Sequence, residues 1–325
     1  MFALWKRYRH AAAVAPLVLA MIATAAAQTP YPSRNITLVL PFAAGSGTDT
    51  TTRLIGKELG TALGVSTVID NKAGANGSIA ASYVARSAPD GYTLFVTTNT
   101  SHSANPYLLK NMTYDPVKDF TPIARTGDLP FMLVIHPEIP ANSVADLIAL
   151  AKKEPGKYSY ASGSSAAIVA GATFARLAGI DLLHVPYKSS PPALTDLIAG
   201  RVSMMFIDVP TGLPHVNAKA LKALAVTTKK RSALLPDLPT MDDTVKGFDI
   251  TSWQGYFGPA NMPKDVVTRL NAEIRKVVER PDIKGQLAER GMEAFSGTPE
   301  EFDAFVKEQL KVWEKLITEA GIEKQ

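Results

Sequence analysis

The sequence predicts an α/β protein built from two similar domains that contain parallel sheet. Apolar segments of strand length alternate with amphipathic segments of helix length along the chain, the pattern typical of parallel α/β folds. One local unit, a buried strand followed by a loop of very small residues and a helix, occurs at residues 38–63 and again at residues 158–178. Because these units lie far apart in the sequence, we expect two domains that face each other across a cleft.

The first 27 residues have the features of an export signal. Lys6, Arg7 and Arg9 precede an apolar run over residues 11–23, and three alanines at 25–27 fit a cleavage site after Ala27. The apolar run is shorter than the roughly 20 residues of a membrane-spanning helix. The chain contains no cysteine, which excludes a lipoprotein anchor and disulfides. We therefore expect a periplasmic protein, and removing 27 of the 325 residues leaves 298, enough for about two domains.

The charge of the chain gives no indication of a nucleic-acid partner. The formal net charge of +4 includes the three basic residues of the signal segment, so the remaining chain carries about +1. No block of lysines and arginines interleaved with aromatic residues occurs. We expect no binding to nucleic acid.

Strands are expected where short apolar runs end in loop residues, at positions 38–40, 66–70, 92–97, 123–135, 158–161, 184–187, 204–207 and 224–226. The run at 123–135 is interpreted as one long, interrupted strand. Met204 and Met205 are expected in the core, since methionine is a flexible apolar filler.

Helices are expected over residues 78–87, 166–178, 193–199 and 266–278, with another beginning at Ser143. The helix after residue 48 should bury one apolar stripe, made of Leu54, Ile55, Leu59, Ala62 and Leu63. The last helix opens with the capping box of residues 298–301. Its expected buried face consists of Phe302, Phe305, Val306, Trp313 and Leu316.

Residues 38–49 are the first candidate binding segment. A strand ends in a loop without large side chains and a helix begins, so backbone N–H groups converge in a way that suits an anion. These residues alone favour an ordinary turn in which Thr48 or Asp49 caps the helix. The loop matches neither nucleotide-binding glycine pattern. A second polar segment, the hydroxyl-rich loop 97–103, also follows a predicted parallel strand, where open α/β sheets bind ligands.

Few residues suggest catalysis. No G-x-S-x-G motif and no metal-binding spacing occurs, so neither a metal nor a cofactor is expected. After the signal segment the histidines are His102, His136, His184 and His215; His102, in the hydroxyl-rich loop, is the one candidate among them. We therefore expect a binding protein and not an enzyme.

The carboxylates Asp49, Asp181, Asp196 and Asp208 fall at separate elements with no local pairing. We interpret most of them as helix caps or surface groups. Asp208, at the end of an apolar strand, is the exception, because a cap and a ligand contact fit its position equally.

Several motifs together resemble the extracytoplasmic solute-binding receptors of tripartite tricarboxylate transporters, also called Bug receptors. They lie in family order over nearly the whole exported chain, at residues 31–34, 41–49, 88–94, 114–120, 184–188, 192–197, 213–215, 224–227 and 298–302.

The resemblance implies a two-domain, type II flytrap fold of periplasmic solute-binding proteins. Each domain would be a mixed, mostly parallel sheet flanked by helices, and crossover strands would join the two. Domain I would hold residues 28–126 and 229–325, and domain II residues 127–228. The partners implied are a small carboxylate and the permease subunits of a membrane transporter, and the receptor itself would be a monomer.

With the resemblance, we expect the ligand to contact backbone N–H groups and hydroxyls from both domains. The expected ligand-binding residues are Phe42, Ala43, Ala44, Gly45, Ser46, Thr97, Thr98, Ser162, Ser164, Tyr187 and Asp208. The sequence departs from the family at Ser46, Ile168, Ser189 and Ser190, and its loop over residues 162–168 is shorter. An apolar domain II wall would favour a ligand with hydrophobic or aromatic bulk.

The expected function is capture of a di-, tri- or aromatic carboxylic acid and its delivery to a permease. A sensor that hands its liganded form to a membrane signalling protein is an alternative that the sequence does not separate from transport. An exported hydrolase is a weaker alternative, because no nucleophile stands beside a base.

Overall fold

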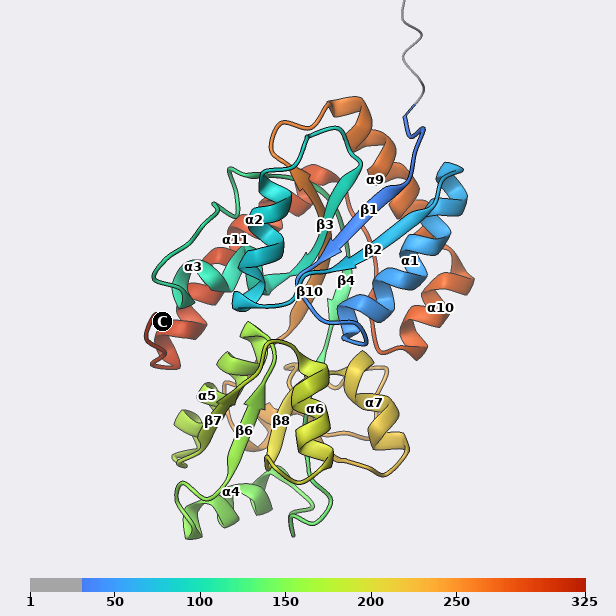
Figure 1. The fold of residues 1–325 in the computed structure, drawn as a ribbon. Helices are drawn as coiled ribbons and strands as arrows, with labels where there is room; N and C mark the ends of the chain where they lie inside the picture. Colours follow the sequence, from blue (N-terminus) through green and yellow to red (C-terminus); the bar gives the residue numbers. More distant parts are fainter. Residues whose placement is uncertain (1–30) are drawn as a thin grey trace, which may run out of the picture.

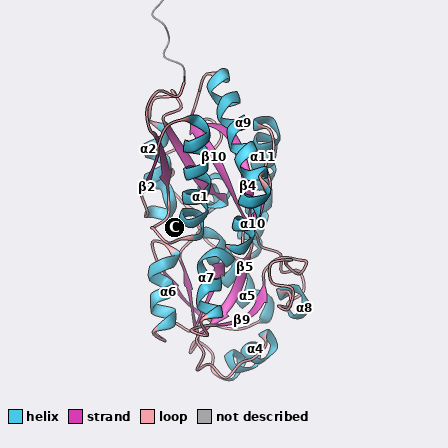
Figure 2. Ribbon diagram, turned by 90° about the vertical axis from the view of Figure 1, so that its right-hand side faces the viewer, coloured by secondary structure: helices cyan, strands magenta, loops and turns pink. Residues whose placement is uncertain are grey.

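The structure, a computed structural model, describes residues 31–325. The predicted signal segment, residues 1–27, lies outside the described residues. Two sheets form separate units, one above the other in Figure 1, which we call domain I and domain II. Helices flank both sheets in the side view of Figure 2. The two-domain α/β architecture expected from the sequence is confirmed.

Domain I contains a six-stranded mixed sheet with the strand order β11-β4-β10-β3-β1-β2. β1, β2 and β3 are parallel, whereas β10 runs antiparallel to β3 and β4. The strands are β1 (Ile36–Leu40), β2 (Thr67–Asn71), β3 (Thr93–Thr98), β4 (Phe120–Leu129), β10 (Ser252–Pro259) and β11 (Glu293–Ala294).

Both faces of this sheet are covered, so its central strands are apolar throughout. Leu38 and Leu40 of β1 pack against one helical layer, while Val39 between them packs against the other. The first layer consists of α1 (Gly47–Leu63), α9 (Lys264–Glu279) and α10 (Pro281–Glu289). The second consists mainly of α2 (Ser78–Ala85) and α11 (Pro299–Glu319); a π-helical turn (Thr100–Ala104) and α3 (Asn105–Leu108) follow β3.

Domain II contains a five-stranded mixed sheet with the order β7-β6-β8-β5-β9. Its strands are β5 (Phe131–Ile135), β6 (Ser159–Ser162), β7 (Leu183–Pro186), β8 (Met204–Asp208) and β9 (Lys222–Val226). One face packs against α4 (Val144–Lys153), α5 (Ser165–Ala178) and α8 (Met241–Thr244). The other packs against α6 (Ser190–Ile198) and α7 (Val209–Asn217). Met204 and Met205 are fully buried, as expected.

The chain passes between the domains twice, and the two passages lie side by side. The first is at Pro130, so the expected single strand over residues 123–135 is two strands in different sheets. Proline has no N–H to donate, which explains the break in hydrogen bonding there. The return passage, near Ser252, lies beside the first, because Ser252 pairs with Leu129 at the end of β4.

The positions of the domain boundaries remain a proposal. β4 belongs to the first sheet as far as Leu129, and Met241, Val245 and Phe248 pack in the core of domain II. We propose boundaries near Pro130 and Ser252 in place of 126/127 and 228/229.

Two apolar stripes differ in detail from the expectation. On α1, Leu54 is half-buried and Ala62 is exposed, while Gly56 and Gly60 approach β2 instead. On α11, Ile317 takes the buried place expected for Leu316, and the C-terminal part of this helix packs on domain II. The capping box that opens α11 is present as expected.

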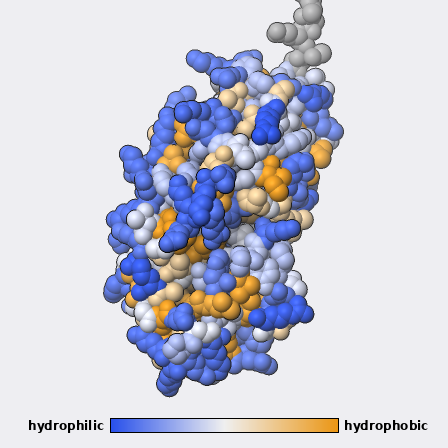
Figure 3. Space-filling view, turned by 60° about the vertical axis from the view of Figure 1, so that its left-hand side comes forward, coloured by the Kyte–Doolittle hydropathy of each residue, from blue (hydrophilic) through white to orange (hydrophobic). Residues whose placement is uncertain are grey.

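The surface is mostly polar. Figure 3 shows one face on which hydrophilic residues predominate, with separate hydrophobic areas between them. The large apolar side chains that are exposed come from several elements of both domains, and they are Val68, Ile79, Tyr83, Leu177, Leu183, Phe295 and Val312. Within residues 31–325, no helix combines the length and apolar character that a membrane span requires.

Candidate functional site

A cavity between the two domains brings together the ends of strands from both sheets. Its domain I wall is formed by Phe42, Ser46, Gly47, Thr48, Thr98, Leu129 and Ser252. Its domain II wall is formed by Phe131, Ser164, Ser190 and Asp208. The volume in which the centre of a water molecule fits is about 20 Å³. The cavity therefore has room for about one water molecule.

Four helices begin at this cavity. Ser46 and Ser164 are the N-caps of α1 and α5, and each hydroxyl accepts a backbone N–H at 3.3 Å. α6 begins at Ser190, and α7 is capped by Asp208. The first N–H groups of a helix lack partners within the helix and carry partial positive charge, which favours an anion.

In α7 these N–H groups are used or missing, because Val209 N donates to Pro130 O, Pro210 has no N–H and Thr211 N donates to Asp208. Prolines also remove two of them from α6, so the N–H groups that face the cavity come mainly from α1 and α5. None of the residues found to line the cavity is basic.

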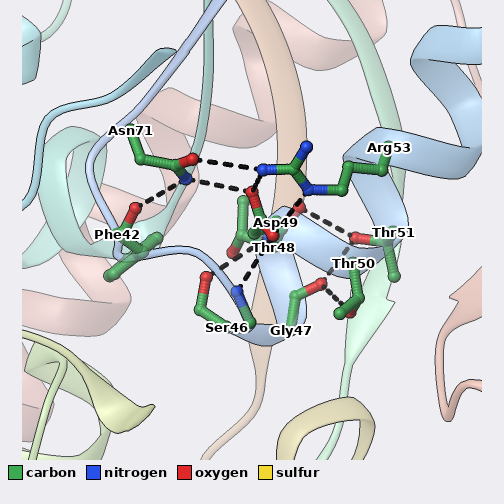
Figure 4. Close-up of polar contacts among 10 residues, drawn as sticks. Phe42, Ser46, Gly47, Thr48, Asp49, Thr50, Thr51, Arg53 and Asn71 are labelled. Atoms are coloured by element: carbon green, nitrogen blue, oxygen red, sulfur yellow. Dashed lines mark hydrogen bonds and ion pairs between the residues drawn. The ribbon is translucent and has the colours of Figure 1, made fainter. Parts of the chain in front are cut away.

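The loop between β1 and α1 is held by a network around Asp49, which Figure 4 shows. The Asp49 carboxylate accepts two hydrogen bonds from Arg53 at 2.9 Å and one each from Gly45 N and Asn71 Nδ2 at 3.0 Å. Asn71 Nδ2 also donates to Phe42 O at 2.9 Å. Burial alone would raise the pKa of Asp49, but these hydrogen bonds lower it below its ordinary value. The network fixes the loop that carries the domain I wall.

Asp208 caps α7, one of the two roles that the sequence left open, and it also lines the cavity. Its Oδ1 accepts Thr211 N at 3.0 Å and the Thr211 hydroxyl at 2.5 Å. Burial raises the pKa of this carboxyl group. The cap lies directly against domain I, because a Cβ added to Gly47 would overlap Asp208 Oδ1.

The structure brings five of the eleven expected site residues together at the cavity: Phe42, Ser46, Thr98, Ser164 and Asp208. The other three residues of the first loop lie outside its lining. Ala44 and Gly45 are exposed, and Gly45 N is directed to Asp49. Ala43 N donates to Ser189 Oγ across the two domains at 3.1 Å.

Three further expected residues bond within their own domain and do not line the cavity. Thr97 Oγ1 lies 2.6 Å from Ser101 Oγ, and the Tyr187 hydroxyl donates to Asp196 at 2.6 Å. Ser162 Oγ lies 2.7 Å from His184 Nε2. The expectation that no nucleophilic side chain stands beside a base is therefore wrong, because the Ser162 hydroxyl contacts a histidine ring. Ser162 is buried, however, and does not line the cavity.

Two expectations about polar groups are wrong. Neither Thr48 nor Asp49 caps α1, because Ser46 does so, and Asp49 is a buried acceptor in the loop network. His102, the histidine singled out in the sequence, is fully buried and stacked on Phe257 with the ring centres 3.9 Å apart. Complete burial lowers its pKa to about 3, so it is neutral at ordinary pH.

Sequence reasoning missed several residues of the cavity wall. Gly47 and Thr48 belong to the first candidate binding segment, residues 38–49. Ser190 begins the helix that the two prolines at 191 and 192 predict. Local sequence patterns could therefore have identified these three residues. Leu129 and Phe131 flank Pro130, where a break between two sheets was the missing signal. Ser252 has no local signal, because only sheet pairing sets it opposite Leu129.

The described residues contain no cluster of three or more His, Asp or Glu side chains that could hold a metal ion. The N–H groups and hydroxyls of the cavity lining suit the binding of a small anion.

Comparisons with known proteins place this architecture in a family. Residues 51–322 match the sequence profile described as "Tripartite tricarboxylate transporter family receptor". The UPF0065 protein in the tcbD-tcbE intergenic region of Pseudomonas sp. strain P51 is 36% identical over 293 residues, which cover 89% of this chain and 87% of that protein.

Two solved structures are also similar. R. palustris Rpa4515 with adipate has a TM-score of 0.89 and 36% identity, over 91% of this chain and 100% of that one. MatC from Rhodopseudomonas palustris with bound malate has a TM-score of 0.83 and 30% identity, over 88% and 100% of the two chains. This chain therefore belongs to the tripartite tricarboxylate transporter receptor family, whose fold is that of solute-binding proteins.

Proposed function

We propose that this protein is a periplasmic receptor that captures a small carboxylate between its two domains and delivers it to the permease of a tripartite transporter. It acts as a monomer and does not chemically change its ligand. Removal of the signal segment after Ala27 releases the protein into the periplasm, where receptors of this family reside.

The meeting of the N-termini of α1 and α5, one from each domain, at one interdomain cavity carries this proposal. Hydroxyls of Ser46, Thr98, Ser164, Ser190 and Ser252 lie beside these termini or between them. A carboxylate accepts hydrogen bonds only, so a lining rich in N–H and O–H donors matches it. Two similar proteins were solved with adipate and malate, both of them dicarboxylates.

Ligand entry requires the two walls to separate. The room in the cavity corresponds to about one water molecule, whereas even a four-carbon dicarboxylate contains eight non-hydrogen atoms. The passages at Pro130 and near Ser252 are the positions where the chain crosses between domains, and they lie side by side because Ser252 pairs with Leu129. We propose that the domains move about these two passages.

A thermal-unfolding screen tests carboxylate capture. The panel contains aliphatic dicarboxylates, tricarboxylates, acidic amino acids and aromatic acids, each with a matching neutral amide as control. A ligand at about 100 times its Kd adds roughly 2.7 kcal/mol to the free energy of unfolding, a readily measured increase in Tm. We expect an increase with at least one acid and none with its amide. Equal increases with acid and amide, or none with any acid for protein freed of bound ligand by unfolding and refolding, contradict the proposal.

Delivery to a permease is tested separately. The purified receptor, with and without the acid identified in the screen, is used to capture partners from detergent-solubilised membranes of its host. Recovery of transporter subunits in the presence of the acid supports transport. Recovery of a membrane signalling protein instead supports the sensor alternative.

A further inference from the structure

The cavity contains one ionisable side chain, and its charge has the same sign as the proposed ligand. Asp208 is the single charged residue among those found to line the cavity; the others offer hydroxyls, backbone groups or apolar surface. An ionised carboxylate accepts hydrogen bonds and donates none. A second carboxylate placed beside it would be repelled, so this side chain must affect which acids bind.

One oxygen of the Asp208 carboxylate is left for a ligand. Thr211 donates both of its hydrogen bonds to Oδ1, and within residues 31–325 no hydrogen bond to Oδ2 and no ion pair of Asp208 is found. The residue is 8% exposed, and this exposure is to the cavity. Asp208 Oδ2 is not among the buried polar atoms that lack a partner, so it is accessible from the cavity, and a donor on the ligand can bond it.

The carboxylate also lies very close to the proposed anion position. A Cβ on Gly47 would overlap Asp208 Oδ1, and it would be 3.2 Å from Cβ of Pro210. Asp208 therefore lies over the first turn of α1, whose N–H groups face the ligand. A ligand group that accepts from α1 and one that donates to Asp208 are therefore near neighbours in the ligand, and adjacent carbon atoms give the shortest such spacing.

We propose that Asp208 selects carboxylates that carry a hydrogen-bond donor, a hydroxyl or an ammonium group, on the carbon next to the carboxylate. This inference rests on the proposed function, because it assumes that a carboxylate binds at the start of α1. The donor bonds Oδ2 of Asp208, while the ligand carboxylate accepts N–H groups of α1. Phe42, Leu129 and Phe131 then surround the carbon skeleton.

The test compares pairs of acids that differ only in the donor. Succinate is paired with 2-hydroxysuccinate and 2-aminosuccinate, and 3-phenylpropanoate with its 2-hydroxy and 2-amino derivatives, both enantiomers of each. Kd values are measured by isothermal titration calorimetry on the exported protein. We expect a donor-bearing acid to bind at least tenfold more tightly than its plain partner, and the tighter of the hydroxyl and amino forms identifies the donor.

Two variants connect this discrimination to Asp208. Asp208→Asn and Asp208→Ser both keep a side chain that can cap α7, and unfolding measurements verify that they fold. We expect each to reduce the ratio of the two Kd values to threefold or less. Asp146→Asn, which removes an exposed carboxylate in the first turn of α4, is the matched control and should leave the ratio unchanged.

The outcomes separate this inference from the proposed function. Plain acids that bind as tightly as their hydroxylated and aminated partners overturn the inference alone, as does a ratio that Asp208→Asn and Asp208→Ser preserve. If no acid of any kind binds, while the protein is folded, the proposed function fails and the inference fails with it.

Discussion

The two walls of the cavity are built on one local plan and differ in how their polar groups are satisfied. In each, a buried strand ends in a loop of small residues, and a serine at the helix N-cap accepts an N–H at 3.3 Å. The domain I wall then uses a carboxylate, Asp49, as an internal acceptor for its own loop. The domain II wall presents its carboxylate, Asp208, to the cavity.

The histidines behind the two walls differ in how deeply they are buried. His102 of domain I is fully buried, with Nδ1 3.0 Å from Ser101 Oγ and no hydrogen-bond partner found for Nε2 in the part of the chain described. His184 of domain II is half-buried, 2.7 Å from Ser162 Oγ and stacked on Tyr160. The walls thus differ in the use of their carboxylates, since Asp49 of domain I fixes its own loop and Asp208 of domain II faces the cavity. The predictions below test this difference, from the largest expected effect to the smallest.

The largest effect is expected at His102 in acid. Its pKa is lowered from 6.5 to about 3 by burial, so the unfolded chain binds a proton below pH 6.5 and the folded chain does not. Stability is therefore complete above pH 6.5 and declines as the pH falls toward 3, by about 1.4 kcal/mol per pH unit from this group. Urea unfolding at pH 7 and pH 4.5 should show that His102→Phe removes roughly 2–3 kcal/mol of the acid loss.

His184→Phe is the matched variant in the other wall. The pKa of His184 is also lowered by burial, but the ring is only partly buried, so its variant should change the acid loss much less. Equal effects of the two variants would mean that the two walls do not differ in this respect.

The second prediction concerns the loop network of domain I. Asp49→Asn removes the negative charge that pairs with Arg53 and replaces one of the two acceptor oxygens with an NH₂ group. It should therefore reduce the free energy of unfolding by about 1–2 kcal/mol at pH 7. The lowered pKa of Asp49 means that its contribution is present above pH 4 and lost below it, so the variant and the wild type should converge in strong acid. Arg53→Gln, which removes an exposed partner, should cost less than half as much. An Asp49→Asn protein as stable as the wild type at pH 7 would contradict the inference that the Asp49 network fixes the loop between β1 and α1.

The third prediction concerns the contact between the walls. Gly47→Ala places a methyl group where Asp208 Oδ1 lies, so the domains should not approach fully and the Kd for the acid identified in the screen should rise at least tenfold. The unfolding free energy should not fall, because alanine favours a helix over glycine by about 1 kcal/mol. Gly285→Ala, in α10 with open space around it, is the control that should change neither the affinity nor the fold. An unchanged Kd for Gly47→Ala would show that the walls do not meet when the ligand is bound.

Local patterns predicted most of the fold, because alternating apolar runs, capping serines and prolines act within a few residues. The strand, loop and helix at residues 38–63 and the capping box before α11 follow from such signals. The break at Pro130 was not predicted, since it depends on which sheet each half of the apolar run joins. The burial of Ile317 in place of Leu316 depends on packing between domains, which no local signal carries.

The candidate site was predicted as a set of loops more reliably than as a set of side chains. Sequence identified the loops after β1 and β6, and the segment after β3 that forms a π-helical turn, because small and hydroxyl residues follow apolar strands there. It also identified Asp208 at the end of β8. It did not determine which groups turn inward: Gly45 N bonds Asp49, and Tyr187 bonds Asp196. Hydrogen bonds between elements decide this, and they depend on the tertiary arrangement.

The smallest effect, and the sharpest contrast with Asp49, is expected from Asp208→Asn. Burial raises the pKa of Asp208, so the ionised form is disfavoured in the folded protein at pH 7. Asparagine keeps the cap on α7 without the charge, and the free energy of unfolding should stay equal or rise by up to about 1 kcal/mol. The gain should shrink as the pH falls and the wild-type carboxyl group takes up a proton. Urea unfolding at pH 7 and pH 4.5 measures both values. A loss above 1 kcal/mol at pH 7 would mean that Asp208 has a stabilising partner, as Asp49 has, and the two walls would then be alike.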